Sequence, residues 1–223
     1  MTEAKRLTLG TSAAVKEKRL AALLAGREAS GPALELAVVE AQVRGSLELA
    51  GLAADSDADA LRRAVAAVDP KAPLTVQALL TWQAALTGET SFRRQPRERA
   101  DGPPPAPVEF IASRLDIVEQ WLGGDSGREL KPAQSGALAL ARIVEILPFQ
   151  RGNGRVARLA ASHLMVRAGS RRPILIGGDA PRLQEALQAA FQLHTEPLAR
   201  MLEEAAERAL DVSIATLEAE GPR

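Results

Sequence analysis

The sequence predicts an all-α protein, and two observations lead to this prediction. Apolar residues recur at helical spacing along most of the 223 residues, and start and stop signals flank these periodic segments. Only residues 90–93, and more weakly 174–176, have a pattern typical of extended backbone. The helices that we expect span residues 12–24, 34–49, 57–67, 75–86, 107–121, 131–147, 155–168, 181–191 and 197–217.

The first half of the chain contains four of these helices. The region 12–24 alternates charged residues with short apolar stretches, and 34–49 is rich in apolar residues. An aspartate and a serine at 55–56 precede 57–67. Either can cap this helix, because its side-chain oxygen can accept a hydrogen bond from a free amide of the first turn. In 75–86 the apolar residues again follow the helical period.

The second half has clearer boundaries. The helix at 107–121 begins with a proline and is followed by two glycines, and prolines also begin 181–191 and 197–217. Proline suits the first turn of a helix because that turn has amides without partners. Trp82 and Trp121 fall among apolar neighbours at helical spacing, so we expect both in the core or between helices.

Composition indicates one compact domain. Hydrophobic residues make up 46% of the chain and aromatic residues only 3%, so Ala, Leu, Val and Ile must form most of the core. The formal net charge is zero, which argues against a general nucleic-acid surface. The chain has no cysteine and therefore no disulfide or thiolate metal site. The excess of arginine over lysine, with abundant alanine, suits a bacterium of high genomic G+C content.

The N-terminal 24 residues lack the apolar core of a signal peptide, and no apolar run is long enough to span a bilayer. We therefore expect a cytoplasmic protein that does not associate with a membrane.

The segment 147–158 contains the most informative pattern. Gly152-Asn153-Gly154 is a tight turn, since both residue types tolerate positive φ. The apolar run that follows predicts a helix whose first amides and positive dipole end face the same cavity, an arrangement that binds anions. Arg155 and Arg158 share one helical face, and Arg151 precedes the turn. The alternative is a plain glycine loop with solvated arginines.

This stretch resembles the signature loop of the Fic (Fido) family, H-P-F-x-D/E-G-N-G-R-x-x-R. The resemblance covers about two-thirds of the chain, with a proline-rich entry at 102–107, and implies a Fic-type core at 74–217, an N-terminal helical region at 1–73 and a tail at 218–223. The matching residues are Pro148, Phe149, Gly152, Asn153, Gly154, Arg155 and Arg158.

Two departures from the motif concern its chemistry. In the family, the first motif position is the histidine that takes the proton from the target hydroxyl, and here it is Leu147, which cannot carry a proton. The family's acidic residue holds the magnesium ion that bridges the nucleotide phosphates, and here it is Arg151, which repels a metal. The chain thus resembles a degenerate member with no catalytic residue at the histidine position and no metal ligand.

One hypothesis is that the guanidinium of Arg151 supplies the positive charge that Mg²⁺ and its carboxylate supply together, so that ATP or another phosphorylated ligand binds without metal. Its rival is that an exposed arginine at 151 has no role. His163 and His194 are the only histidines, and neither lies where it could replace the missing base. His163 is expected on a helix face or half-buried.

The family also has an inhibitory helix with the motif S/T-x-x-x-E-G/N. Its counterpart here lies in 34–49, and Arg44 then occupies the position of the inhibitory glutamate, before Gly45. In this register Arg44 and Arg158 lie close together. The alternative is that Glu40 and Arg44 form an exposed pair one helical turn apart.

The resemblance further implies a short β-hairpin flap near Phe92. In the family this flap holds a target segment by strand addition, so we expect a protein partner to bind there. Three functions stay open: a phosphate-binding relative of protein adenylyltransferases that is impaired in AMP transfer, a transferase or lyase for another phosphorylated substrate, and a regulatory or scaffold protein with a vestigial pocket. The sequence does not indicate the oligomeric state.

Overall fold

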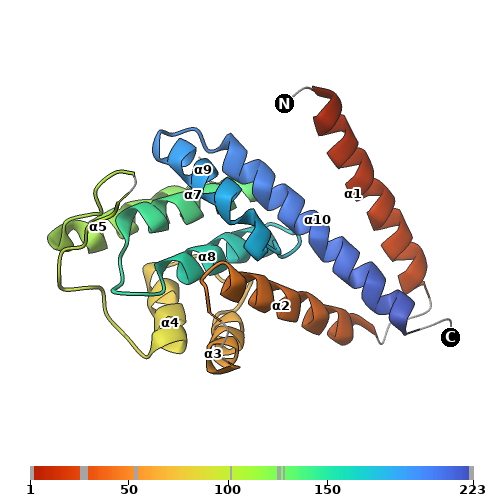
Figure 1. Cartoon of the computed structure of the whole chain (residues 1–223), viewed down its shortest axis with the longest axis horizontal. Helices are drawn as coiled ribbons and strands as arrows, with labels where there is room; N and C mark the ends of the chain where they lie inside the picture. The colour runs from red at the N-terminus through yellow and green to blue at the C-terminus, as the bar shows by residue number, and fades with distance from the viewer. Residues whose placement is uncertain are drawn as a thin grey trace.

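A computed structural model of the protein describes residues 3–25, 30–52, 55–100, 102–124, 127 and 129–220, with side chains from residue 12 onward. The described residues are helical or irregular, with no strand among them. The helices, shown in Figure 1, are α1 (Glu3–Leu24), α2 (Gly31–Glu48), α3 (Asp55–Ala66), α4 (Val76–Thr87), α5 (Ile111–Gly123), α7 (Pro132–Ile146), α8 (Asn153–Arg167), α9 (Ala180–Phe191) and α10 (Glu196–Ala219), with short 3-10 turns at Val108–Phe110 and Gly177–Asp179.

The pair α7 and α8 forms the centre of the fold, with α4, α5, α9 and α10 packed around it and α2 bonded to α8 through Gln42 and Ser46 (Figure 1). Both helices are rich in alanine, which lets their backbones approach closely. Gly136 on α7 shows how close this approach is, because an added Cβ would lie 3.2 Å from Ala161 O. Nearly every side chain from Asn153 to Met165 is buried, so α8 is a core helix rather than an amphipathic surface helix.

Helix α1 lies at the edge of the molecule and packs on α10 (Figure 1). Its apolar contact is a small separate cluster in which Leu20 meets Leu34, Leu210 and Leu217. Polar contacts, such as the Lys16–Glu207 ion pair at 2.7 Å, complete the attachment.

The predicted helices agree with the observed ones within a few residues at most ends. Thr75 caps α4 by accepting a bond from the Ala78 amide (3.1 Å), and Gly88 ends the helix with φ of +77°. Two differences are clear: α1 begins at Glu3, and Trp121 is 41% exposed whereas Trp82 is buried. No helix in the described ranges is both long and apolar enough to cross a membrane.

The predicted β-hairpin flap is wrong. Residues 89–100 and 102–107 are irregular and contain no strand; residue 101 lies outside the described residues. The segment around 174–176 is extended but likewise pairs with no strand in the described part of the chain.

Arg93 explains why the hairpin does not form. This residue is buried, its backbone N–H donates to Pro148 O (2.9 Å), and its side chain donates to the carbonyls of Leu147 (2.7 Å), Gln95 (2.9 Å) and Ala106. In a hairpin the carbonyls of Gln95 and Ala106 would need backbone partners, and here the guanidinium of Arg93 binds them instead. Phe92 is half-buried, with its ring 5.9 Å from that of Phe149, so the site expected for a partner is turned partly toward the core.

Candidate functional site

The loop between α7 and α8 has positive φ at both ends. Leu147 follows α7 with φ of +50°, and Gly152 precedes α8 with φ of +80°. A side chain at 152 would be strained, and its Cβ would lie 3.2 Å from Gln83 Oε1. Glycine is therefore required at 152 by both backbone conformation and space.

Asn153 braces this loop from inside. Its Oδ1 accepts a bond from the Phe149 N–H, and its Nδ2 donates to Phe149 O, both at 2.8 Å. The ring of Phe149 is completely buried and anchors the loop to the core. The side chain of Asn153 thus fixes the loop, which leaves its backbone amide at the first turn of α8.

The first turn of α8 is the expected anion-binding element. The Val156 N–H bonds to Gly152 O (3.0 Å), and the amides of residues 153–155 precede this first intrahelical bond. Arg155 and Arg158 flank the turn. The Arg155 Nη2 lies 3.8 Å from where a Cβ of Gly152 would be, and Arg158 Nη1 lies 3.2 Å from the corresponding point on Gly154. Two of the three predicted arginines therefore meet at the turn.

Arg158 is a partly buried cation with neutral partners. Its Nε donates to Ser46 Oγ (3.0 Å) and its Nη2 donates to Ser46 O (2.9 Å). No carboxylate pairs with Arg158 in the part of the chain that the structure describes. Burial, and secondarily the neighbouring Arg155, lower the pKa of Arg158 to about 10. The charge of this guanidinium is uncompensated and would be stabilised by an anion.

Arg155 has a weak acidic partner. Its Nη1 lies 3.5 Å from Asp57 Oδ1, at the limit of a hydrogen bond, and its side chain is mostly buried. Asp57 belongs to the first turn of α3, where a carboxylate is stabilised by the helix dipole.

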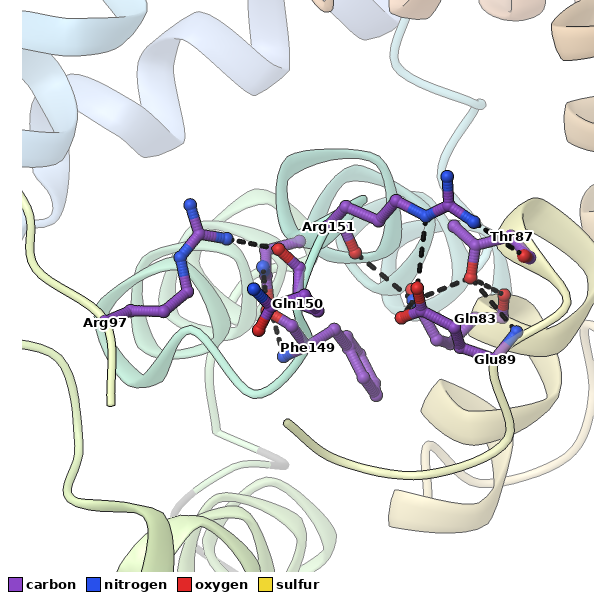
Figure 2. Close-up of polar contacts among 8 residues, drawn as sticks. Gln83, Thr87, Glu89, Arg97, Phe149, Gln150 and Arg151 are labelled. Atoms are coloured by element: carbon purple, nitrogen blue, oxygen red, sulfur yellow. Dashed lines mark hydrogen bonds and ion pairs between the residues drawn. The ribbon is translucent and has the colours of Figure 1, made fainter. Parts of the chain in front are cut away.

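Arg151 does not join the other two arginines. Figure 2 shows its guanidinium directed toward Glu89 and Thr87, with Nε bonded to Glu89 Oε1 and Nη2 bonded to Thr87 O, both at 3.1 Å. Its side chain is 65% exposed. The metal-replacing role expected of Arg151 requires this side chain to leave Glu89, and it stays a prediction.

The residues of the loop do not fit a magnesium ion. The family's acidic ligand position holds the cation Arg151, and the carboxylate of Glu89 is bonded to that same cation. A Mg²⁺-dependent step has no ligand set in this loop.

Arg44 does not contact Arg158 as expected; Ser46, two residues further along α2, does. Arg44 itself is exposed. Glu40 bonds with Arg62 of α3 (2.7 and 2.8 Å). Gly45 explains the register of α2, because a Cβ there would lie 1.8 Å from Leu175 O. The close approach at Gly45 places Ser46 against the guanidinium.

Sequence reasoning missed Gln83, which contacts the loop. It lies between Leu79 and Leu86 on the apolar face of α4 and is completely buried. A polar residue in an apolar stripe is the signal that could have found it, since buried polar groups are almost always bonded to something.

His163 is buried, as part of the core helix. Its Nε2–H donates to Ala72 O (2.9 Å), and its ring meets Trp82 edge-on at 5.6 Å. Burial lowers the pKa of His163, with the Ala72 carbonyl opposing this effect. His194 lies exposed in the turn before α10. Neither histidine is bonded to the loop.

His163 should make the protein less stable at acid pH. As the pH falls below about 6.5, the unfolded chain takes up a proton at 163 that the folded chain, with its lower pKa, does not, so the free energy of unfolding decreases. Urea unfolding at pH values from about 7.5 to 5 should show that the free energy of unfolding depends less steeply on pH in His163→Gln than in the parent. His194→Gln is the control and should keep the parent slope, and equal slopes in all three proteins would contradict this account.

Fold and site together define a class: an all-helical protein with a glycine turn that opens onto a buried central helix and two arginines beside it. Comparison with known proteins shows which family the central part of the chain resembles. Residues 73–165 match the model of the Fic/DOC family, so this part of the chain is similar to a Fic/DOC domain.

Curated relatives include the protein adenylyltransferase Fic of Drosophila virilis, 31% identical over 121 residues, which are 54% of this chain and 25% of that protein. The Drosophila mojavensis protein of the same name is 31% identical over 109 residues, or 49% of this chain and 22% of that protein. The chain thus matches about a quarter of the length of these relatives.

Two solved structures show the same fold. A Fic domain containing signaling protein from Bacteroides thetaiotaomicron has a TM-score of 0.75 at 16% identity, over 95% of this chain and 100% of that chain. Fic-1 from C. elegans has a TM-score of 0.68 at 18% identity, over 98% of this chain and 77% of that chain.

Proposed function

We propose that this protein binds a phosphate-bearing ligand, with a nucleotide such as ATP as the first candidate, at the first turn of α8. The observation that carries the proposal is the partly buried Arg158, whose described partners are neutral and whose guanidinium lies beside Gly154. A partly buried cation without a counter-ion is unfavourable for the fold by itself, and an anion that binds there would explain its presence.

The binding groups are the backbone of Gly152, Asn153 and Gly154 and the side chains of Arg155 and Arg158. Amides at a helix N-terminus donate to phosphate oxygens, and guanidinium groups add charge-assisted hydrogen bonds. A phosphate would replace Asp57 on Arg155 and share Arg158 with Ser46. Arg151 would strengthen binding from the rim if it exchanged Glu89 for the ligand.

AMP transfer by the family's histidine mechanism is impaired in this proposal. Leu147 has no group that could accept the hydroxyl proton of a target, and the neighbouring residues provide no replacement histidine. The relatives are named protein adenylyltransferases, and the partial overlap with them supports a related pocket in this chain.

Calorimetric titration with ATP and with inorganic phosphate in EDTA tests this proposal. We expect saturable binding without metal, and a loss of about ten- to hundredfold in affinity for Arg158→Gln, because one charge-assisted bond is removed. Arg167→Gln removes an exposed arginine at the other end of α8 and is the matched control. Equal affinity of Arg158→Gln and the parent would contradict the proposal.

The two other functions give different results. Formation of a product from a panel of phosphorylated compounds would support a transferase or lyase with another mechanism. No heat beyond dilution with any anion would support the regulatory or scaffold role with a vestigial pocket.

A further inference from the structure

The backbone carbonyls of residues 147–151 are all held by donors of the protein. Arg93 binds the carbonyls of Leu147 and Pro148, and Asn153 binds that of Phe149. Figure 2 shows the next two contacts: Arg97 Nη1 donates to Gln150 O, and Gln83 Nε2 donates to Arg151 O (3.2 Å).

We infer that Gln83 and Arg97, which lie outside the motif, are positioning residues of the anion site: they hold the carbonyl oxygens of Arg151 and Gln150 so that these cannot turn toward a bound phosphate. The inference rests on the proposed function. Free peptides in a glycine-containing loop can rotate, and a carbonyl oxygen that faced an anion would repel it. A bonded carbonyl keeps its direction, and the N–H of the same trans peptide keeps the opposite one.

Gln83 is explained poorly by stability alone. The two N–H bonds of its Nε2 are shared among three acceptors, Thr87 Oγ1 (2.8 Å), Glu89 Oε2 (3.2 Å) and Arg151 O (3.2 Å), whereas its Oε1 is buried without a partner. An unpartnered buried oxygen is unfavourable, and a leucine would fill this place on the apolar face of α4 without one. The glutamine therefore serves the loop, which it binds through the residue just before Gly152.

Arg97 lies on the surface in the irregular segment after α4, and its guanidinium reaches back to Gln150. Arg94 lies in the same segment, is also exposed, and makes no bond to the loop among the described residues. The two arginines differ in the contact with the loop, so Arg94 is a control for the loss of one positive charge.

The test is an NMR titration of ¹⁵N-glycine-labelled protein with inorganic phosphate, following the amides of Gly152 and Gly154. In Gln83→Leu we expect shifted Gly152 and Gly154 resonances before phosphate is added and about five- to tenfold weaker phosphate binding. Arg97→Gln should weaken binding by a similar factor. The controls are Gln42→Leu, which removes another buried glutamine whose Nε2 bonds Ser162 Oγ (2.8 Å), and Arg94→Gln, and both should stay within about twofold of the parent.

Thermal unfolding of each variant shows whether it folds. Folded Gln83→Leu with the parent's glycine resonances and phosphate affinity would overturn the inference, as would equal weakening by Arg94→Gln and Arg97→Gln. If the parent itself shows no phosphate-dependent shift, the proposed function fails. The inference is then judged on the ligand-free glycine resonances and on their hydrogen exchange, which should be faster in Gln83→Leu and Arg97→Gln than in their controls.

Discussion

Ser46→Asp is expected to lose at least about a hundredfold in affinity for phosphate and ATP. Ser46 Oγ already accepts a bond from Arg158 Nε at 3.0 Å, and an aspartate Oδ can occupy nearly the same position. The new carboxylate would neutralise Arg158 and also repel the phosphate at a distance of several ångströms. Removing one charge-assisted bond and adding one unfavourable charge pair each contribute about 1.5–3 kcal/mol, so together they exceed the effect of deleting the arginine. Calorimetric titration measures the change.

Ser46→Asn separates charge from size. It places at 46 a neutral side chain of the same shape as aspartate, and the affinity of this variant for phosphate should stay within about tenfold of the parent's. Thermal unfolding should show that Ser46→Asp is at least as stable as Ser46→Asn, because the new carboxylate pairs with the partly buried Arg158. An Asp variant that still binds phosphate as tightly as the Asn variant would mean that Arg158 is not part of the binding site.

The sequence predicted the helices and the glycine turn because these depend on neighbouring residues. Thr75 caps its own helix through an amide three residues away, and Gly152 needs only its own backbone conformation. The same local logic placed Arg155 and Arg158 beside the turn, since residues three apart share a helix face.

The contacts that decide the chemistry of these arginines join distant parts of the chain. Ser46 is 112 positions from Arg158, and Gln83 is 68 positions from Arg151. Arg44 was expected at Arg158 from the motif register alone, whereas the register in space follows from the approach of Gly45 to Leu175 O, which no local pattern contains.

The hairpin prediction was wrong for a related reason. Residues 90–93 have a pattern typical of extended backbone, but the decisive interactions of Arg93 are made with carbonyls of other segments. A buried guanidinium with several carbonyl partners removes the need for a second strand. Local pattern could not show this, because arginine is mostly exposed and is not expected as the anchor of a loop.

Leu147→His combined with Arg151→Asp is expected to give Mg²⁺-dependent transfer of AMP from ATP to a protein hydroxyl, with release of pyrophosphate, where the parent gives none. Histidine tolerates the positive φ of residue 147 better than leucine does, so the substitution should not disturb the loop. It supplies the general base that the parent lacks. The aspartate introduced at position 151 would lie near Glu89, and two carboxylates repel each other without a cation but bind Mg²⁺ together. Mass spectrometry after incubation with ATP and Mg²⁺ detects the added AMP.

The controls distinguish the base from the metal. Leu147→Gln with Arg151→Asp should bind ATP with Mg²⁺ and transfer nothing, whereas Leu147→His alone keeps Arg151, which repels the metal, and should also be inactive. Thermal unfolding with and without Mg²⁺ should show the Arg151→Asp proteins gaining stability from the metal. A folded double variant that binds ATP with Mg²⁺ yet transfers no AMP would show that a histidine at 147 and an aspartate at 151 are not enough for the reaction. The contact of Ser46 with Arg158 would then be the next one to remove, because it ties this arginine of α8 to α2.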